Sequence, residues 1–232
     1  MIVVTGAAGR MGRQVLQRLV DEGTEVRGTD KVAFDDSPAP YIQADLCDPD
    51  KAREVLKGAD ALIHMGAIPG AAGAPGMPPA ISPTDVFENN VQSTFNIMMA
   101  ASDEKIQRMV FSSSAFAMGW AHDPLAFVPK YLPLDEEHPM MPFETYGLSK
   151  QIGENIAGMI SRNSSMSIAS LRFTNVASPE VQAEFPWPAP IPEDPRTLVL
   201  WAYADQRDVV EMHLLALRGE FEGHEPFLIA QP

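Results

Sequence analysis

Three glycines follow the first apolar run of the chain at three-residue spacing. The run MIVVT is typical of a short strand, and the segment Arg10–Asp21 behind the glycines has apolar residues at helical spacing. A tight turn needs one glycine or two, so Gly6, Gly9 and Gly12 together indicate a backbone that approaches another group closely. The chain is therefore expected to begin with a strand, a close turn and a helix that starts at that turn.

Strands and helices alternate along the rest of the chain, an order typical of βαβ units with a parallel sheet covered on both faces. We therefore predict an α/β fold with a Rossmann-type doubly wound parallel sheet. The predicted strands are residues 1–5, 24–30, 41–45, 59–67, 106–115, 166–176 and 226–230, with a further short apolar run at 197–203. The predicted helices are residues 10–21, 48–56, 85–104, 143–162 and 204–219.

Two segments interrupt this alternation. Residues 68–83 are rich in glycine, alanine and proline, and residues 178–196 hold many of the 21 prolines. Neither composition suits a helix or a central strand. Each segment follows a strand at the carboxyl edge of the predicted sheet, where open α/β sheets bind ligands. We predict loops that line a substrate site, with ordinary surface loops as the alternative.

Composition narrows the classes of partner. The length of 232 residues suits one large domain, and a net charge of -14 disfavours nucleic acid. No apolar run reaches the length of a membrane span, and no signal peptide is evident, so a cytoplasmic protein with no membrane partner is expected. The single cysteine, Cys47, fits a reducing compartment and is expected to be a small buried side chain. No residue spacing suggests a metal site.

An acidic residue about 20 positions beyond the glycines gives them a specific interpretation. Gly6 would permit the turn, Gly9 would let amides approach a pyrophosphate, and Gly12 would let the helix pack on the strand. Asp30, at the end of the second strand, would accept the ribose hydroxyls of NAD and repel the 2′-phosphate of NADP. Lys31 beside it could tolerate a phosphate, but NAD is the predicted cofactor. A glycine-rich turn without a ligand is the alternative.

A tyrosine and a lysine suggest the chemistry. Tyr146 and Lys150 are four residues apart on a predicted helix, so their side chains share one face. A lysine cation favours the phenolate, which can take a proton from an alcohol while a hydride leaves the same carbon. The cluster FSSSA ends the strand at residues 106–115, and a hydroxyl there could hold the substrate oxygen. An ordinary solvated helix face is the alternative for the tyrosine and the lysine.

The order of these motifs resembles the extended short-chain dehydrogenase/reductase family, which includes nucleotide-sugar epimerases, dehydratases and uronate dehydrogenases. The resemblance rests on the glycines, Asp30, Asp45-Leu46, HMGA, NNVQSTFNIMMAA, SSSAFAMG and YGLSK, and it covers residues 1–176 well. It implies an NAD-binding domain at residues 1–176. Residues 177–232 would supply substrate-binding loops, a closing helix and a strand within the same globule. A homodimer formed by the two long helices is also implied.

The resemblance also implies residue roles. Ser114 would be the catalytic serine, rather than Ser112 or Ser113, because it lies five residues before Gly119. Ser114 would also bind substrate, and it would form the catalytic set with Tyr146 and Lys150. The lysine would also hold the nicotinamide ribose. Asp45 and Leu46 would flank the adenine, and Ala67 would line the cofactor cleft. The full set of expected cofactor contacts is Gly6, Gly9, Arg10, Met11, Gly12, Asp30, Asp45, Leu46, Ala67, Asn90, Tyr146 and Lys150.

Three departures from the family bear on the substrate. Met118 stands where sugar epimerases usually carry tyrosine. The chain ends where nucleotide-sugar enzymes usually continue, so either a tail is missing or the substrate is small. Residues 195–217 resemble the compact end of uronate dehydrogenases, in which an arginine holds the substrate carboxylate. Arg196 occupies a comparable place, with a surface arginine as the alternative.

The expected function is that of an NAD-dependent oxidoreductase acting on a secondary alcohol or hemiacetal carbon of a sugar, a sugar acid or a similar small hydroxy compound. A nucleotide-sugar 4-epimerase or dehydratase that retains NAD is one alternative, and a non-catalytic NAD-binding regulatory module is another. His64 is expected to be a buried, hydrogen-bonded histidine. His122 and His138 are expected in loops, with His122 as the second candidate for the base.

Overall fold

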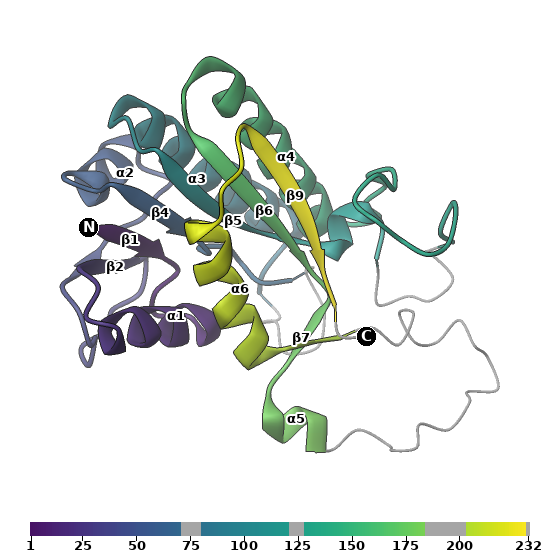
Figure 1. Ribbon diagram of the computed structural model, residues 1–232, viewed down its shortest axis with the longest axis horizontal. Coiled ribbons are helices and arrows are strands. Elements are labelled where there is room, and N and C mark those ends of the chain that lie inside the picture. Colours follow the sequence, from purple (N-terminus) through teal and green to yellow (C-terminus); the bar gives the residue numbers. More distant parts are fainter. Residues whose placement is uncertain (71–79, 121–127, 184–202, 231–232) are drawn as a thin grey trace.

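The computed structural model describes residues 1–70, 80–120, 128–183 and 203–230. Seven strands of these residues form one sheet in the order β3-β2-β1-β4-β5-β6-β9 (Figure 1). Every neighbouring pair in this sheet is parallel, and the first six strands have the doubly wound order of a Rossmann fold. The strands are β1 (Ile2–Thr5), β2 (Val26–Asp30), β3 (Tyr41–Gln43), β4 (Ala61–His64), β5 (Arg108–Ser114), β6 (Ser167–Phe173) and β9 (His224–Ile229).

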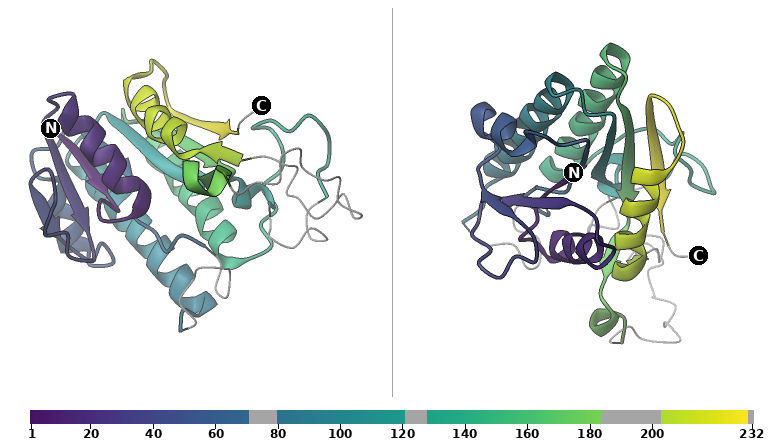
Figure 2. Two further views of the ribbon diagram at one scale, coloured as in Figure 1. Left: turned by 90° about the horizontal axis from the view of Figure 1, so that it is seen from below. Right: turned by 60° about the vertical axis from the view of Figure 1, so that its left-hand side comes forward.

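Helices cover both faces of the sheet, as Figure 2 shows from two sides. Three of them, α2, α3 and α4, pack on one face, and α1 and α6 pack together on the other. The helices are α1 (Arg10–Asp21), α2 (Pro49–Leu56), α3 (Pro83–Asp103), α4 (Thr145–Asn163), α5 (Pro179–Ala183) and α6 (Gln206–Arg218), with a 3₁₀ turn at Ala115–Met118. The predicted fold class is confirmed.

The two faces of the sheet build two separate cores, because successive strand side chains point to opposite faces. Leu62 of β4 packs in the cluster that contains Ile97 of α3. The next residue, Ile63, packs in the cluster that contains Leu16 of α1 and Leu214 of α6. The continuous apolar runs of these strands follow from burial on both faces.

Proline begins two helices within segments where only loops were expected. Ser82 caps α3 through a capping box with Asp85, and Pro83 follows as the first helical residue. Pro179 likewise opens the short helix α5 within the segment 178–196. The expectation that neither segment contains helix was wrong, because proline is compatible with the first turn, where no intrahelical N–H bond is needed.

The predicted strand at residues 166–176 is two strands with different partners. The first part, β6, lies between β5 and β9. After Thr174 the chain leaves this sheet, and β7 (Asn175–Ala177) pairs with β8 (Tyr203–Asp205) in a two-stranded sheet. Asp205 then caps α6 by accepting a hydrogen bond from the Arg207 amide. Local periodicity does not reveal such a change of partner.

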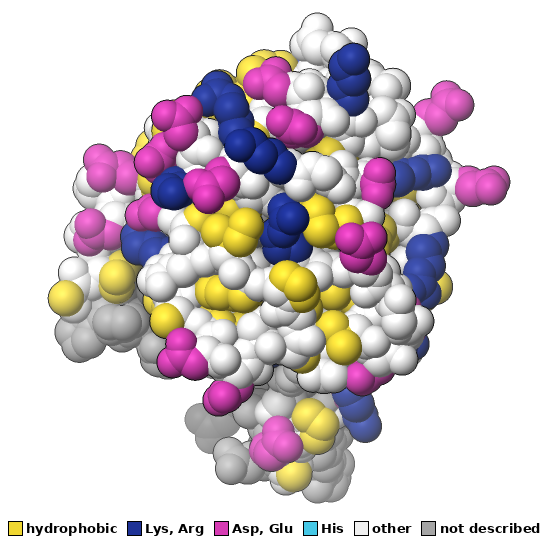
Figure 3. Space-filling model, turned by 90° about the vertical axis from the view of Figure 1, so that its left-hand side faces the viewer, with side chains coloured by type: hydrophobic (Ala, Val, Ile, Leu, Met, Phe, Trp, Pro, Cys, Tyr) yellow, Lys and Arg dark blue, Asp and Glu magenta, His cyan; other side chains and the backbone are white. Residues whose placement is uncertain are grey.

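The surface on the N-terminal side of the molecule is mixed in charge. Figure 3 shows this side, the left of Figure 1, with Lys and Arg side chains interspersed among Asp, Glu and apolar side chains. Although the whole chain has a net charge of -14, the acidic side chains on this face do not form one continuous patch. No helix in the described ranges is long and apolar enough to cross a membrane.

Candidate active site

The glycine loop joins β1 to α1 at the carboxyl edge of the sheet. Gly6 has φ +68°, and a Cβ there would lie 2.8 Å from the Gly66 nitrogen. A Cβ on Gly12 would lie only 2.0 Å from the Gly6 oxygen, so α1 packs directly on the turn. Gly9 caps α1 without a side-chain hydrogen bond, so no side chain occupies the amides of the first turn. Gly6 thus adopts the expected turn conformation, and Gly12 packs α1 against this turn, whereas a contact of either glycine with a cofactor stays a prediction.

Asp30 lies beside this loop at the end of β2. Its Oδ2 accepts a hydrogen bond of 3.1 Å from the Ala8 amide, and its Oδ1 accepts one of 3.4 Å from the Val32 amide. The ammonium of Lys31 lies 3.4 Å from Asp45 Oδ2, across the gap between the two strand ends. The charge of Lys31 is therefore paired with a carboxylate rather than held beside Asp30.

The Asp45 turn borders a hollow. Asp45 is exposed and accepts a hydrogen bond from the Cys47 amide, which, with Lys31, holds the pKa of its carboxyl below the usual range. Leu46 beside it is buried. A cavity of about 660 Å³ opens here, lined in part by Lys31, Cys47 and Ile68. The role of Asp45 and Leu46 beside an adenine stays a prediction.

The structure brings Ser114, Tyr146 and Lys150 together. Ser114 ends β5, and its side chain lies beside that of Tyr146, in the first turn of α4. Lys150 lies one turn further along α4, with its Nζ 5.5 Å from the centroid of the Tyr146 ring.

The three serines of this strand end have different partners. The Ser112 hydroxyl lies 2.6 Å from His213 Nε2, and the Ser113 hydroxyl donates a hydrogen bond of 2.5 Å to Glu154 Oε1. The Ser114 hydroxyl accepts a hydrogen bond of 3.2 Å from the Phe116 amide, and Ser114 is the serine whose side chain lies beside Tyr146. These contacts support its choice as the candidate catalytic serine.

Burial shifts the tyrosine and the lysine toward their neutral forms. It raises the pKa of Tyr146 to about 12, with the Ser114 side chain opposing the rise and the charge of Glu144 adding to it. It lowers the pKa of Lys150 to about 8, and the charge of Glu154 opposes this. The expected lowering of the Tyr146 pKa by Lys150 is therefore not seen. Burial dominates, and the lysine ammonium donates instead to the Ser112 carbonyl at 2.7 Å.

The sequence matches a family model described as "NAD dependent epimerase/dehydratase family" over residues 2–192. The chain belongs to this family. The resemblance drawn from the motifs and the prediction of NAD as cofactor are confirmed at the level of the family.

Relatives of this family member include both sugar dehydrogenases and sugar epimerases. The chain is 26% identical over 221 residues to uronate dehydrogenase from Pseudomonas putida, covering 92% of this chain and 70% of that protein. It is 30% identical over 189 residues to a putative UDP-glucose 4-epimerase from Methanocaldococcus jannaschii, covering 76% of this chain and 56% of that protein. The chain spans about half the length of several curated epimerases that it matches.

A solved structure of a short-chain dehydrogenase/reductase superfamily protein from Agrobacterium tumefaciens, with bound NAD, matches with a TM-score of 0.78. The two proteins are 26% identical, and the match covers 99% of this chain and 77% of that one.

Three further predicted cofactor residues have contacts within the protein. Asn90 is buried; its Oδ1 accepts from the Ile68 amide at 2.7 Å, and its Nδ2 donates to the Ile68 carbonyl at 3.1 Å. It thereby fixes the turn that follows Ala67. Met11 packs against the core on the α1 face, and exposed Arg10 donates to the Val176 carbonyl at 3.4 Å. A contact of any of them with NAD stays a prediction.

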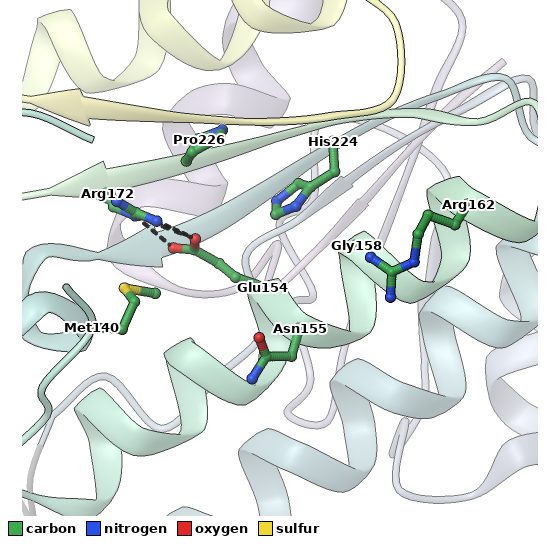
Figure 4. Close-up of a pocket in the computed structure, with 8 residues that line it drawn as sticks. All are labelled: Met140, Glu154, Asn155, Gly158, Arg162, Arg172, His224 and Pro226. Atoms are coloured by element: carbon green, nitrogen blue, oxygen red, sulfur yellow. Dashed lines mark hydrogen bonds and ion pairs between the residues drawn. The ribbon is translucent and has the colours of Figure 1, made fainter. Parts of the chain in front are cut away.

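Two supporting groups escaped the motif analysis. Glu144 caps α4 by accepting hydrogen bonds of 2.6 Å from the amides of Tyr146 and Gly147, which sets the first turn of this helix. A buried ion pair between Glu154 and Arg172 lies one turn beyond Lys150 (Figure 4). The first has a local signal, an acidic residue just before the helix. The second group, the ion pair of Glu154 and Arg172, joins residues 18 positions apart and has no local signal in the sequence.

The remaining predictions have mixed outcomes. His64 is buried between Thr5 and Thr94, as expected, and burial lowers its pKa to about 3. His138 lies in a loop but is also buried, and its Nε2 accepts from the Lys130 amide. Cys47 is only half-buried. His122 and Arg196 lie outside the described residues. Within the described ranges, no cluster of three side chains could hold a metal ion.

Proposed function

We propose that the chain is an NAD-dependent oxidoreductase that oxidises a secondary alcohol or hemiacetal carbon of a sugar, a sugar acid or a similar small hydroxy compound. The observation that supports this most is the position of Ser114, Tyr146 and Lys150 at the carboxyl edge of the sheet, where the glycine loop also lies. A module that only binds NAD has no use for a serine, a tyrosine and a lysine gathered at this edge.

The residues of the loop fit NAD. The uncapped first turn of α1 can bind the pyrophosphate through its amides, and the Asp30 carboxylate lies beside the same loop to accept ribose hydroxyls. The cofactor, when bound, supplies the hydride acceptor and a positive charge. Because Lys31 is paired with Asp45, it is not held beside Asp30, where it could favour a 2′-phosphate.

The contacts support a catalytic role for each of the three residues. Ser114 orients the substrate hydroxyl toward Tyr146, and Tyr146 takes its proton as the hydride leaves the carbon, which leaves a carbonyl product. Lys150 supplies a positive charge, since a pKa of about 8 keeps it mostly protonated at pH 7. Ionisation of Tyr146 requires further positive charge nearby, because its pKa is about 12.

A sugar acid is the proposed substrate class. The similarity to a uronate dehydrogenase extends over 92% of the chain, further than the 76% shared with the putative epimerase. Residues 177–232 would supply the substrate side, and the guanidinium of Arg196 would bind a carboxylate through two parallel hydrogen bonds. The two-loop pocket at residues 68–83 and 178–196 stays a proposal, since much of both segments lies outside the described residues.

A nucleotide-sugar 4-epimerase is the second candidate, favoured by the 30% identity to a putative UDP-glucose 4-epimerase. We also propose a homodimer in the cytoplasm. The dimer is supported by Phe95 of α3 and Leu148 of α4, which are 41% and 37% exposed on two helices that pack together.

A panel of free aldoses, uronates and nucleotide sugars, incubated with NAD, tests the proposal. Net NADH formation with a uronate or another free sugar supports the oxidoreductase, and epimerised product without net NADH identifies the epimerase. Arg196→Lys should raise the KM for a uronate strongly, because lysine lacks the planar guanidinium. The carboxylate role of Arg196 is wrong if this variant has unchanged kinetics.

A further inference from the structure

A second cavity, of about 550 Å³, opens between α4, β6 and β9 (Figure 4). None of Ser114, Tyr146 or Lys150 lines it, so it is separate from the candidate active site. Its lining residues are Met140, Glu154, Asn155, Gly158, Arg162, Arg172, His224 and Pro226.

The cavity carries one unbalanced positive charge. Arg172 is neutralised by Glu154, with Nη2 and Oε2 2.8 Å apart and both side chains buried. Arg162 is exposed and has no ion pair or hydrogen bond with any residue in the described part of the chain. An unpaired arginine at a cavity is notable in a chain of net charge -14, because acidic side chains are abundant elsewhere on its surface.

His224 offers a hydrogen-bond donor to the same space. Its Nε2 lies 2.8 Å from the hydroxyl of Ser170, which is fully buried and has no other partner among the described residues. The Ser170 hydroxyl is satisfied when it donates to Nε2, and this leaves the ring proton on Nδ1. Burial also lowers the pKa of His224, which favours the neutral ring.

Gly158 brings the two groups to one point. A Cβ on this residue would lie 3.3 Å from Arg162 Nη1 and 3.5 Å from His224 Nδ1. Both nitrogens therefore border a single small space that the missing side chain leaves open. Figure 4 shows Arg162 on α4 and His224 on β9 at this end of the cavity, with Met140 and Pro226 at the other.

We propose that this cavity binds a small organic monocarboxylate, with the carboxylate between Arg162 and His224 and the carbon chain toward Met140 and Pro226. A planar guanidinium matches the geometry of a carboxylate, and an imidazole N–H can complete its hydrogen bonds. One unpaired cation balances a monoanion. A phosphate dianion would leave a negative charge unpaired in an already acidic protein.

Butyrate is a suitable probe, with the neutral isostere butyramide as its control at matched ionic strength. Butyrate should raise the Tm of the full chain in a saturable manner, and butyramide should not. It should also shift one histidine ring resonance, which His224→Gln identifies by its loss. The proposal is overturned if butyrate has no saturable effect, or if the shifted resonance belongs to another histidine.

Three variants locate the effect. Arg162→Gln should weaken butyrate binding about tenfold or more, whereas Arg53→Gln, on an exposed cation of α2, should leave it unchanged. Gly158→Ala should also weaken binding because its methyl group fills the shared space, while alanine favours the helix and so preserves the fold. Equal binding by wild type and Arg162→Gln would contradict the proposal.

Arg196→Gln separates this cavity from the proposed substrate site. If butyrate binds at Arg162, the affinity of Arg196→Gln for butyrate is that of the wild type. If instead Arg196→Gln abolishes binding and Arg162→Gln does not, butyrate occupies the substrate site, and the cavity proposal is wrong.

Discussion

The Lys150 ammonium donates a hydrogen bond of 2.7 Å to the backbone carbonyl of Ser112, two residues before the end of β5. This contact ties α4 to the strand that ends in Ser114. It also fixes the direction of a buried positive charge, and the ammonium lies 5.5 Å from the centroid of the Tyr146 ring on the same helix face.

Removal of the phenol should abolish most turnover. Tyr146→Phe keeps the ring and removes the proton acceptor, so kcat should fall by about 10²-fold or more while NAD still binds. Steady-state kinetics and NAD titration measure the two effects. Tyr131→Phe, which removes an exposed hydroxyl bonded to Asp135, is the control. Unchanged turnover in Tyr146→Phe would move the base elsewhere, with His122 as the next candidate.

Two carboxylates should set the cofactor preference. Asp30→Ala should weaken NAD binding and relax the rejection of NADP, because the carboxylate beside the glycine loop is lost. Asp45→Asn should also increase the use of NADP, because it frees the Lys31 ammonium from its partner at 3.4 Å. Adding Lys31→Gln to Asp45→Asn should remove that gain. Tighter binding of NADP than of NAD by the wild type would refute this account of Asp30.

Buried histidines should make the fold sensitive to acid. Burial lowers the pKa of His64 to about 3 and that of His213 to about 4, so both are neutral in the folded protein where the unfolded chain takes up protons. The free energy of unfolding is not reduced by these histidines above pH 6.5, the ordinary histidine pKa. It falls as the pH drops below that value. The free energy of unfolding should fall by up to about 1.4 kcal/mol per pH unit for each histidine. Urea titrations at several pH values measure this slope, which His64→Asn should reduce. An unchanged slope in that variant would show that His64 does not contribute.

Gly12 should tolerate no side chain. The Cβ of Gly12→Ala would lie 2.0 Å from a backbone oxygen of the glycine loop, so the helix must move away from the turn. We expect a loss of about 1–3 kcal/mol or more in the free energy of unfolding, together with weaker NAD binding. Gly9→Ala, whose Cβ would meet one oxygen at 3.1 Å, should cost less stability. Equal thermal stability of Gly12→Ala and wild type would contradict the packing role.

The exposed apolar pair of Phe95 on α3 and Leu148 on α4 should control self-association. Phe95→Asp would place a charge on the exposed face of α3, next to α4, where we propose that a second copy packs. Sedimentation velocity should show a dimer for the wild type and a monomer for the variant, with unchanged secondary structure. Val32→Asp, at a residue that is 56% exposed on the β2–β3 connection, is the matched control. A monomeric wild type would refute the dimer.

Features that depend on neighbours in the chain could be predicted closely. The α1 and α2 bounds match the periodic segments because side chains three and four residues apart share a helix face. The same rule placed Tyr146 and Lys150 on one face of α4. The glycine spacing also implied its own structure, since the loop and the helix that it touches are adjacent in sequence.

Features that join distant segments were decided by the tertiary structure. The motif resemblance singled out Ser114 among three adjacent serines, but the partners of these serines on distant elements depend on how α4 and α6 pack against β5. The depth of burial, which depends on the whole fold, set the pKa of Tyr146 against the charge of Lys150.

The sequence by itself therefore determined the order of strands and helices, the glycine loop and the face shared by Tyr146 and Lys150, because these depend on spacings of a few residues. Only the tertiary structure decided the partner of Lys31, the change of sheet after Thr174 and the meeting of Arg162 with His224. The last two residues are 62 positions apart, and they meet only because β9 returns beside β6 under α4. Such contacts depend on how completed elements pack, which no local spacing encodes.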